Sequence, residues 1–240
     1  LYRSQGAVWL RRGLVFADRA AGLFDAGHHW LERALAVARE HHEPPLVQMD
    51  ILEDRAALYV RQDQYDERLY RLLDEAEVLA PEPYRAQEGL GPVEVERATR
   101  GYWRELGQCQ LQRMLSAFGK FDPGESPVVP RPGVEQHGPF DPRQRVLIPP
   151  PGDPKFLDEA AEHLVLMMAY LCRYNRHSWM LVTARRLTLR ELLLRTVGEL
   201  DRFARAAYEA ARRYNLLYDE SFAVAEQVIA VARTNLAPQG

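Results

Sequence analysis

The sequence predicts an all-α protein in which helical hairpins pack with a C-terminal helical bundle, the two being joined by a proline-rich extended segment. Three observations predict this fold class. Apolar residues recur at steps of three and four along most of the chain, as they do on one face of a helix. No stretch shows sustained alternation of β-branched and polar residues, so we expect no sheet. Prolines and glycines fall between the periodic stretches, where helices end and begin.

Periodic apolar residues predict five helices in the first region, residues 1–118. The first helix ends at Gly22, and the second spans about 26–42. Pro44 and Pro45 end the second helix and open the third, because proline suits a first helical turn. The fourth helix closes before Pro81, and the fifth runs from Pro92 towards residue 118.

Residues 119–154 form the second region, which is too rich in proline for a helix or a central strand. Scattered apolar residues, such as Phe140 and Ile148, could hold this arm against the helices. We therefore expect a partly ordered extended strap, and a floppy tether is the alternative.

The third region, residues 155–240, is predicted to be a helical bundle. Ser178 caps a short helix that ends near Leu187, and Asp219 caps the last helix. Between them, Thr188 to Glu191 have the form of a capping box, which predicts a new helix over 188–214. Its apolar residues follow heptad spacing, so it could join two copies of the chain as a homo-oligomer. Packing within the chain is the interpretation that we favour.

Composition narrows the class of protein. The 240 residues are 47% hydrophobic and 27% charged, which is typical of a globular domain. No apolar run approaches the roughly 20 residues that cross a bilayer, so we expect no membrane contact. Cys109 and Cys172 fall on apolar helical faces, which indicates buried thiols in a reducing compartment. We therefore expect a cytoplasmic location.

Two adjacent pairs, His28–His29 and His41–His42, raise the question of a metal site. One helix over 26–42 would separate the pairs by roughly 20 Å, too far for one ion with ligand bonds of about 2 Å. We therefore expect no metal, with the earlier pair exposed in the first helical turn and the later pair at the C-terminus. A third candidate, Glu159 with His163, is expected to be a surface pair.

Motifs for catalysis and cofactor binding are missing from the sequence. It has no His-Glu-x-x-His, no Cys-x-x-Cys and no Gly-Lys-Ser/Thr phosphate loop. No carboxylate lies in an apolar context that would mark a tuned acid. We predict no catalytic residues and no cofactor. A helical enzyme whose site is assembled from distant residues would instead appear as a polar pocket holding perturbed carboxylates.

Charge is distributed unevenly, although the net charge is only −3. Residues 50–82 have 10 acidic and 4 basic residues, a net −6, whereas 173–213 have 10 arginines and 4 acidic residues, a net +6. Arginines interleaved with Tyr174 and Trp179 are typical of phosphate neutralisation with base stacking. The plainer interpretation is a solvated arginine face, or an internal match to the acidic stretch.

Residues 22–35 read G-x-F-x-x-G-x-x-x-L-x-x-A-L, with small and large residues that can interlock two helices: Gly22, Phe24, Gly27, Leu31, Ala34 and Leu35. This pattern resembles the second half of a tetratricopeptide repeat. Ala56, Tyr59, Tyr65 and Leu72 resemble a second copy, so the resemblance covers about residues 22–80. Phe24 and Tyr65 are 41 residues apart, however, where the usual period is about 34.

The resemblance implies an array of helical hairpins that binds peptides or other proteins on a concave surface and lacks catalytic residues. Our leading prediction is a non-catalytic protein-interaction, regulatory or scaffold module, forming part of a larger protein or complex. Its candidate contact residues are Tyr59, Arg61, Gln64 and Arg68. The alternative is a helical nucleic-acid-binding subunit that uses Arg173, Arg176, Arg185, Arg186 and Arg190.

Overall fold

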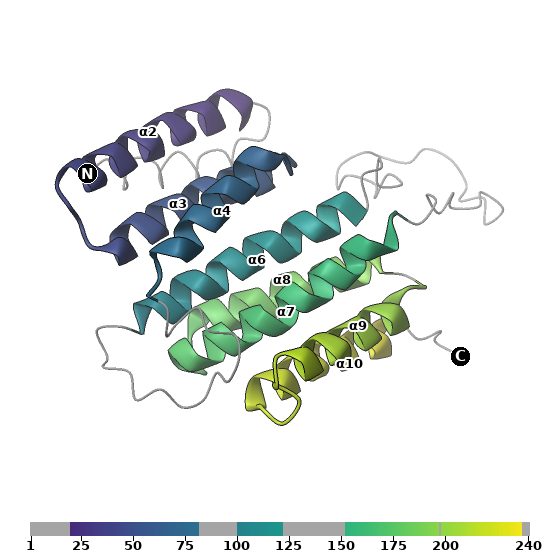
Figure 1. The fold of residues 1–240 in the computed structure, drawn as a ribbon. Coiled ribbons are helices and arrows are strands. Elements are labelled where there is room, and N and C mark those ends of the chain that lie inside the picture. The colour runs from purple at the N-terminus through teal and green to yellow at the C-terminus, as the bar shows by residue number, and fades with distance from the viewer. Residues whose placement is uncertain (1–19, 82–99, 122–151, 197, 237–240) are drawn as a thin grey trace, which may run out of the picture.

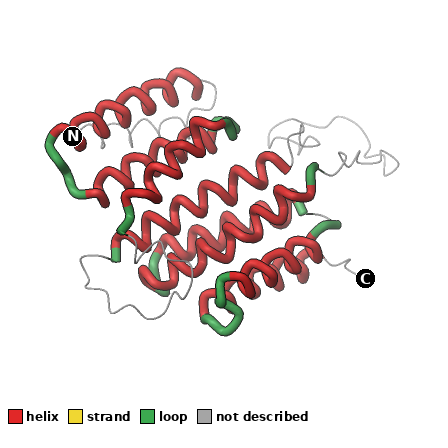
Figure 2. Tube along the Cα trace, in the orientation of Figure 1, coloured by secondary structure: helices red, strands yellow, loops and turns green. Residues whose placement is uncertain are grey.

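The computed structural model describes residues 20–81, 100–121, 152–196 and 198–236. These residues form eight helices and no strand, which confirms the all-α prediction (Figures 1 and 2). The helices are α2 (Ala20–Glu40), α3 (Pro45–Arg61), α4 (Glu67–Leu79), α6 (Gly101–Phe121), α7 (Pro154–Asn175), α8 (Trp179–Arg195), α9 (Leu200–Arg213) and α10 (Glu220–Leu236).

The helices α2, α3 and α4 pack side by side in chain order, with α3 contacting both of the others. Pro45 occupies the first turn of α3, as expected, and Asp66 caps α4 by accepting a hydrogen bond from the backbone N–H of Arg68 at 2.9 Å. The apolar faces meet in a small hydrophobic cluster that includes Leu31, Leu52 and Leu73. These helices form the predicted hairpins.

The most extensive helix–helix interface in the described structure is between α6 and α7. The two helices run antiparallel through the middle of the molecule (Figure 1). They approach closely at Gly107, where a Cβ atom would lie only 2.5 Å from Cδ2 of Leu171. Trp103 and Tyr170 pack nearby with ring centroids 5.9 Å apart. The absence of a side chain at Gly107 therefore permits this contact.

The helices α8, α9 and α10 complete a larger hydrophobic cluster with α6 and α7. Phe118 and Phe203 stack in this cluster at 5.6 Å, and neither side chain is exposed. The predicted caps Ser178 and Asp219 are confirmed: Ser178 Oγ accepts a hydrogen bond from the backbone N–H of Leu181, and an Asp219 oxygen accepts one from that of Ser221.

Several predicted boundaries are wrong, including the start of the second helix, because α2 begins at Ala20 and not near residue 26. Gly22 lies inside α2 rather than at the end of a helix. The short helix after Ser178 continues to Arg195, and Thr188 does not cap a new one. Thr188 is buried inside α8, where its hydroxyl donates to the backbone carbonyl of Ala184 at 2.8 Å. A hydroxyl satisfied by its own preceding turn is compatible with the middle of a helix.

The predicted helix 188–214 is therefore two helices. The chain leaves α8 at Thr196 and re-enters helix at Leu200. The small residues Ala207 and Ala211 of the heptad run are fully buried, and α9 packs on α7 of the same chain. This arrangement follows the interpretation that we favoured, and no continuous seam for a second copy exists over these residues.

The predicted boundary between regions falls between α6 and α7, the two helices that share the most extensive contact. The strap lies mostly outside the described residues, as does the first predicted helix. Among the described residues, no helix is long and apolar enough to cross a membrane.

Candidate functional site

A groove runs over α6 between α3 and α8, with a volume of about 460 Å³. Its floor is the side of α6 that carries Gln108, Leu111, Gln112 and Leu115. All three helices run in the same direction. Leu46 and Tyr65 approach Gly101 and Gly119 at the two ends of α6, and Thr188 and Arg195 hydrogen-bond to Met114 and Phe118. The groove is therefore framed by three parallel helices.

A buried carboxyl group lies at the floor of the groove. Glu53 of α3 is only 7% exposed, and its Oε1 accepts a hydrogen bond from Nε2 of Gln112 at 2.7 Å. Burial is the main reason that the pKa of Glu53 rises to about 8, and the nearby carboxylates of Asp54, Glu105 and Asp50 raise it further. Glu53 is therefore largely protonated at neutral pH.

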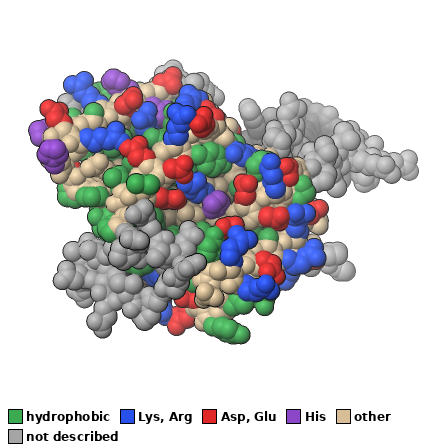
Figure 3. Space-filling view, viewed as in Figure 1, with side chains coloured by type: hydrophobic (Ala, Val, Ile, Leu, Met, Phe, Trp, Pro, Cys, Tyr) green, Lys and Arg blue, Asp and Glu red, His purple; other side chains and the backbone are tan. Residues whose placement is uncertain are grey.

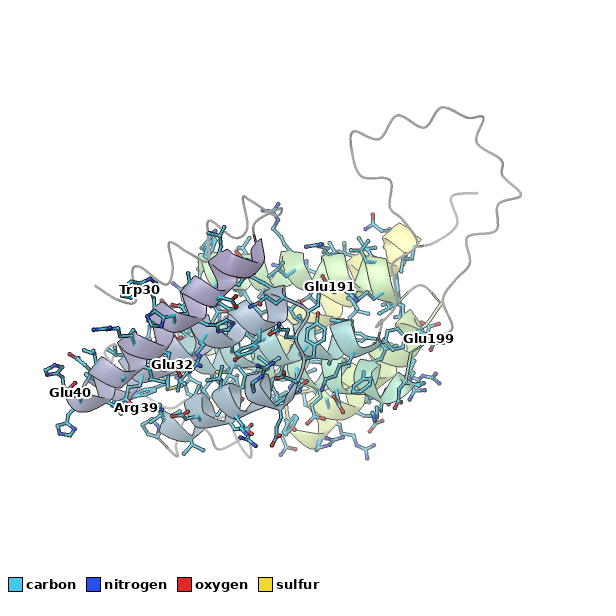
Figure 4. The ribbon with its side chains drawn as sticks, turned by 90° about the horizontal axis from the view of Figure 1, so that it is seen from above. Trp30, Glu32, Arg39, Glu40, Glu191 and Glu199 are labelled. Carbon is cyan, nitrogen blue, oxygen red and sulfur yellow. The ribbon has the colours of Figure 1, made fainter. Side chains whose placement is uncertain are left out.

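The walls of the groove carry arginines that differ in their partners. Arg195 donates from Nε to Glu191 at 2.6 Å within α8, where Figure 4 labels Glu191. Arg61 at the end of α3 and Arg190 of α8 are exposed, and neither has a hydrogen bond or ion pair with a described residue. Desolvation lowers the pKa of Arg61, while the charge of Glu53 opposes this.

The carboxylates of the groove, in contrast, have partners. Asp63 accepts a hydrogen bond from the hydroxyl of Tyr65 at 2.6 Å, Glu191 is bound to Arg195, and Asp54 also has an interaction. Trp179 stands 75% exposed at the opposite end of α8 from Arg190. The groove thus offers two unpartnered cations at one end and an aromatic ring at the other.

The four residues predicted as partner contacts do not form one surface. Tyr59 is buried against His28, with ring centroids 4.4 Å apart, and Arg68 lies over the ring of Tyr59 while bound to Asp66. The backbone N–H of Gln64 donates to the carbonyl of Tyr59. Arg61 lines the groove, and it is the one residue of the four that does so.

The five arginines predicted to bind nucleic acid are also separated. Arg173 and Arg176 are bound to Asp219 and Glu220, and Arg185 donates to Gln227. Arg186 lies in a hollow between α8 and α10, and Arg190 lies in the groove. The structure therefore leaves two of the five, Arg186 and Arg190, without a described partner. They lie one helical turn apart on α8 but line different hollows.

Much of the uneven charge is neutralised by ion pairs between described residues. Arginines of the basic stretch meet carboxylates of α7 and of the start of α10, as in Arg202–Asp158 and Arg213–Glu162. Acidic residues of 50–82 meet arginines of α2, α4 and α6, as in Glu75–Arg39. Figure 3 shows basic and acidic side chains interspersed over one face.

The histidines give no metal site among the described residues, where no group of three or more His, Cys, Asp or Glu side chains could hold an ion. His28 was predicted to lie in the first turn of its helix. This prediction is wrong, because α2 begins at Ala20. His28 is half-buried beside Tyr59, and Gln62 lies 3.0 Å from its Nε2. Burial lowers the pKa of His28 to about 4. His29 is exposed, as predicted. His41 and His42 follow the end of α2, where they were predicted to lie, and they are also exposed.

His163 is partly buried and bonds to Gln110, whereas the prediction was a surface pair with Glu159. Its Nδ1 lies 2.7 Å from Oε1 of Gln110. Nε2 of Gln110 donates to Glu77, and Arg113 also donates to Glu77. This polar network joins α4, α6 and α7. Burial first, and the charge of Arg113 second, lower the pKa of His163 to about 3.

Acid should therefore destabilise the protein through His163. Between pH 6.5 and about 3, the unfolded chain binds a proton at this imidazole and the folded chain does not, so stability falls as the pH falls. By pH 4 the lost contribution of His163 to the free energy of unfolding is roughly 3 kcal/mol. Urea unfolding at pH 7 and pH 4 should show a smaller loss for His163→Gln than for the wild type or for His41→Gln at an exposed position. An equal loss in all three would contradict the role of His163.

Glu53 is the residue that sequence analysis missed, because it was judged to lack an apolar context. A signal was present: α3 is buried almost all round, and Glu53 shares a helical face with Ala57 and Val60. A helix that is apolar on more than one face is buried. A carboxyl group on such a helix is therefore expected to have a raised pKa, because burial disfavours its charged form.

We compared the chain with protein-family models, curated proteins and solved structures, and none of them matches it. The function must therefore be inferred from the geometry of the site itself.

Proposed function

We propose that the chain is a protein-interaction module that binds a segment of another protein in the groove between α3 and α8. The observation that carries this proposal is the placement of Arg61 and Arg190 on opposite walls of one groove, exposed and without described partners. Unpartnered cations beside an exposed aromatic ring, here Trp179, are typical of recognition surfaces, in which arginine and tryptophan are enriched.

The arrangement of the rest of the chain supports a scaffold role. The hairpins α2, α3 and α4 pack in chain order and provide one wall, as the repeats of a tetratricopeptide-like array do. The residues that line the groove include no histidine, cysteine or serine. Glu53 has the perturbed carboxyl expected of an enzyme, but the groove offers no nucleophile of the histidine, cysteine or serine type beside it. Binding is therefore favoured over catalysis.

Nucleic-acid binding remains the second candidate, because Arg186, Arg190 and Trp179 lie along one helix and are exposed. A phosphate backbone requires several free cations along its path. Arg173, Arg176 and Arg185 are already bound within the chain. The groove, with cations on both walls, suits a peptide better.

A random peptide library displayed on phage tests the proposal. Peptides selected on the wild-type chain should lose binding when Thr183→Trp fills the groove, because Thr183 is a partly exposed residue of its wall. The same peptides should bind unchanged to Arg205→Ala, which alters an exposed, unpartnered arginine of α9. If no peptide is selected, or if the selected peptides bind Thr183→Trp as well as the wild type, the proposal is wrong.

A further inference from the structure

The side chains at the two ends of the groove differ in charge and polarity, and this difference indicates what kind of segment fits the groove. We infer that the occupant is an acidic peptide segment, whose carboxylates bind Arg61 and Arg190 while an apolar side chain packs beside Trp179. This inference rests on the proposed function. It adds the chemical class of the partner and says which end of the groove its acidic and apolar side chains occupy.

The first support is the imbalance of partners within the groove. Its acidic residues are engaged by Arg195, by the hydroxyl of Tyr65 or by other groups, whereas Arg61 and Arg190 are not. Both arginines lie towards the same end, because α3 and α8 run parallel and both residues fall in the C-terminal halves of their helices. Guanidinium groups bind carboxylates through paired hydrogen bonds, so two arginines at one end suit one or two acidic side chains.

The second support is the protonation state of Glu53 at the floor of the groove. A charged Glu53 would repel an acidic ligand, but its carboxyl is largely protonated at neutral pH, because burial and neighbouring carboxylates raise its pKa to about 8. Oε1 already accepts from Gln112, and Oε2 has no described partner. The floor is thus polar without adding a negative charge at neutral pH.

The third support is length. From Trp179 to Arg195, α8 extends for roughly 24 Å, which matches about seven residues of extended chain. Trp179 and Arg190 are roughly 16 Å apart along the helix axis, or about five extended residues. A long, open groove of this kind suits a chain segment with an apolar residue at one end and acidic residues about five positions away, rather than a small molecule.

The peptides selected on the wild-type chain test this inference. Those that lose binding to Thr183→Trp should be enriched in Asp and Glu, with an apolar residue about five positions away. In fluorescence anisotropy with labelled peptides, each Glu→Gln replacement should weaken binding about tenfold. Arg61→Ala and Arg190→Ala should each do the same, Arg205→Ala should leave binding unchanged, and binding should weaken with added salt.

The outcomes separate the two proposals. Groove-dependent peptides that are not enriched in acidic residues, or that bind the Arg61→Ala/Arg190→Ala variant unchanged, would overturn the inference and leave the proposed function standing. An absence of groove-dependent peptides would overturn both. A labelled single-stranded DNA oligonucleotide serves as a further competitor. If it binds more tightly than the best acidic peptide and depends on Arg190, the partner is a nucleic acid and the inference is wrong.

Discussion

Replacing Phe118 with alanine should lower the free energy of unfolding by about 3–5 kcal/mol, the largest loss that we expect from a single substitution. The side chain of Phe118 is completely buried and stacks on Phe203 at 5.6 Å. Truncation removes the apolar contacts of the ring and leaves a cavity that rigid neighbouring helices fill only in part. Urea denaturation followed by circular dichroism measures the effect.

Tyr218→Ala is the matched control, because Tyr218 is fully exposed in the turn between α9 and α10. It should change stability by less than about 0.5 kcal/mol. If Phe118→Ala does not fold, Phe118→Leu gives a smaller loss that can still be measured. A Phe118→Ala variant as stable as the control would show that α6 and α9 do not pack as described.

The second large effect has the opposite sign: Glu53→Gln should stabilise the protein at slightly alkaline pH. The pKa of Glu53 is about 8 in the folded chain and about 4.5 when unfolded. Between these values the unfolded chain loses the proton and the folded chain keeps it, so the wild type loses stability as the pH rises. Glutamine does not titrate, and its side-chain oxygen can still accept from Gln112.

The gain from Glu53→Gln should therefore be close to zero near pH 4.5 and roughly 4 kcal/mol at pH 8. Urea unfolding at both pH values measures it, and Glu40→Gln, at an exposed position at the end of α2, is the control. Equal stability of Glu53→Gln and the wild type at pH 8 would contradict a buried, protonated carboxyl group.

Much of the fold could be predicted from local sequence. Pro45, Ser178 and Asp219 mark helix starts because caps and first-turn prolines depend on neighbours only a few residues away. Thr188 shows where this reasoning ends. It has the form of a cap, but a hydroxyl can equally bond to the preceding helical turn, and tertiary packing selected that alternative.

The candidate site was less predictable, because its residues meet only in three dimensions. Arg61 and Arg190 were each singled out by sequence, but for different functions, and only the packing of α3 and α8 on α6 brings them to one groove. Free and bound arginines also look alike in a sequence. Arg173 and Arg190 belong to the same basic stretch, yet Asp219 is a partner for one of them alone.

The position of α6 has a consequence for how the molecule responds to stress. Cys109 of α6 belongs to the small hydrophobic cluster that α2, α3 and α4 form. The other buried apolar residues of α6 belong to the larger hydrophobic cluster, which α7, α8, α9 and α10 complete. Neither half can melt without uncovering part of the same helix, so the described body should unfold cooperatively in a single transition. A ligand resting on α6 would consequently also protect from hydrogen exchange helices that it never touches.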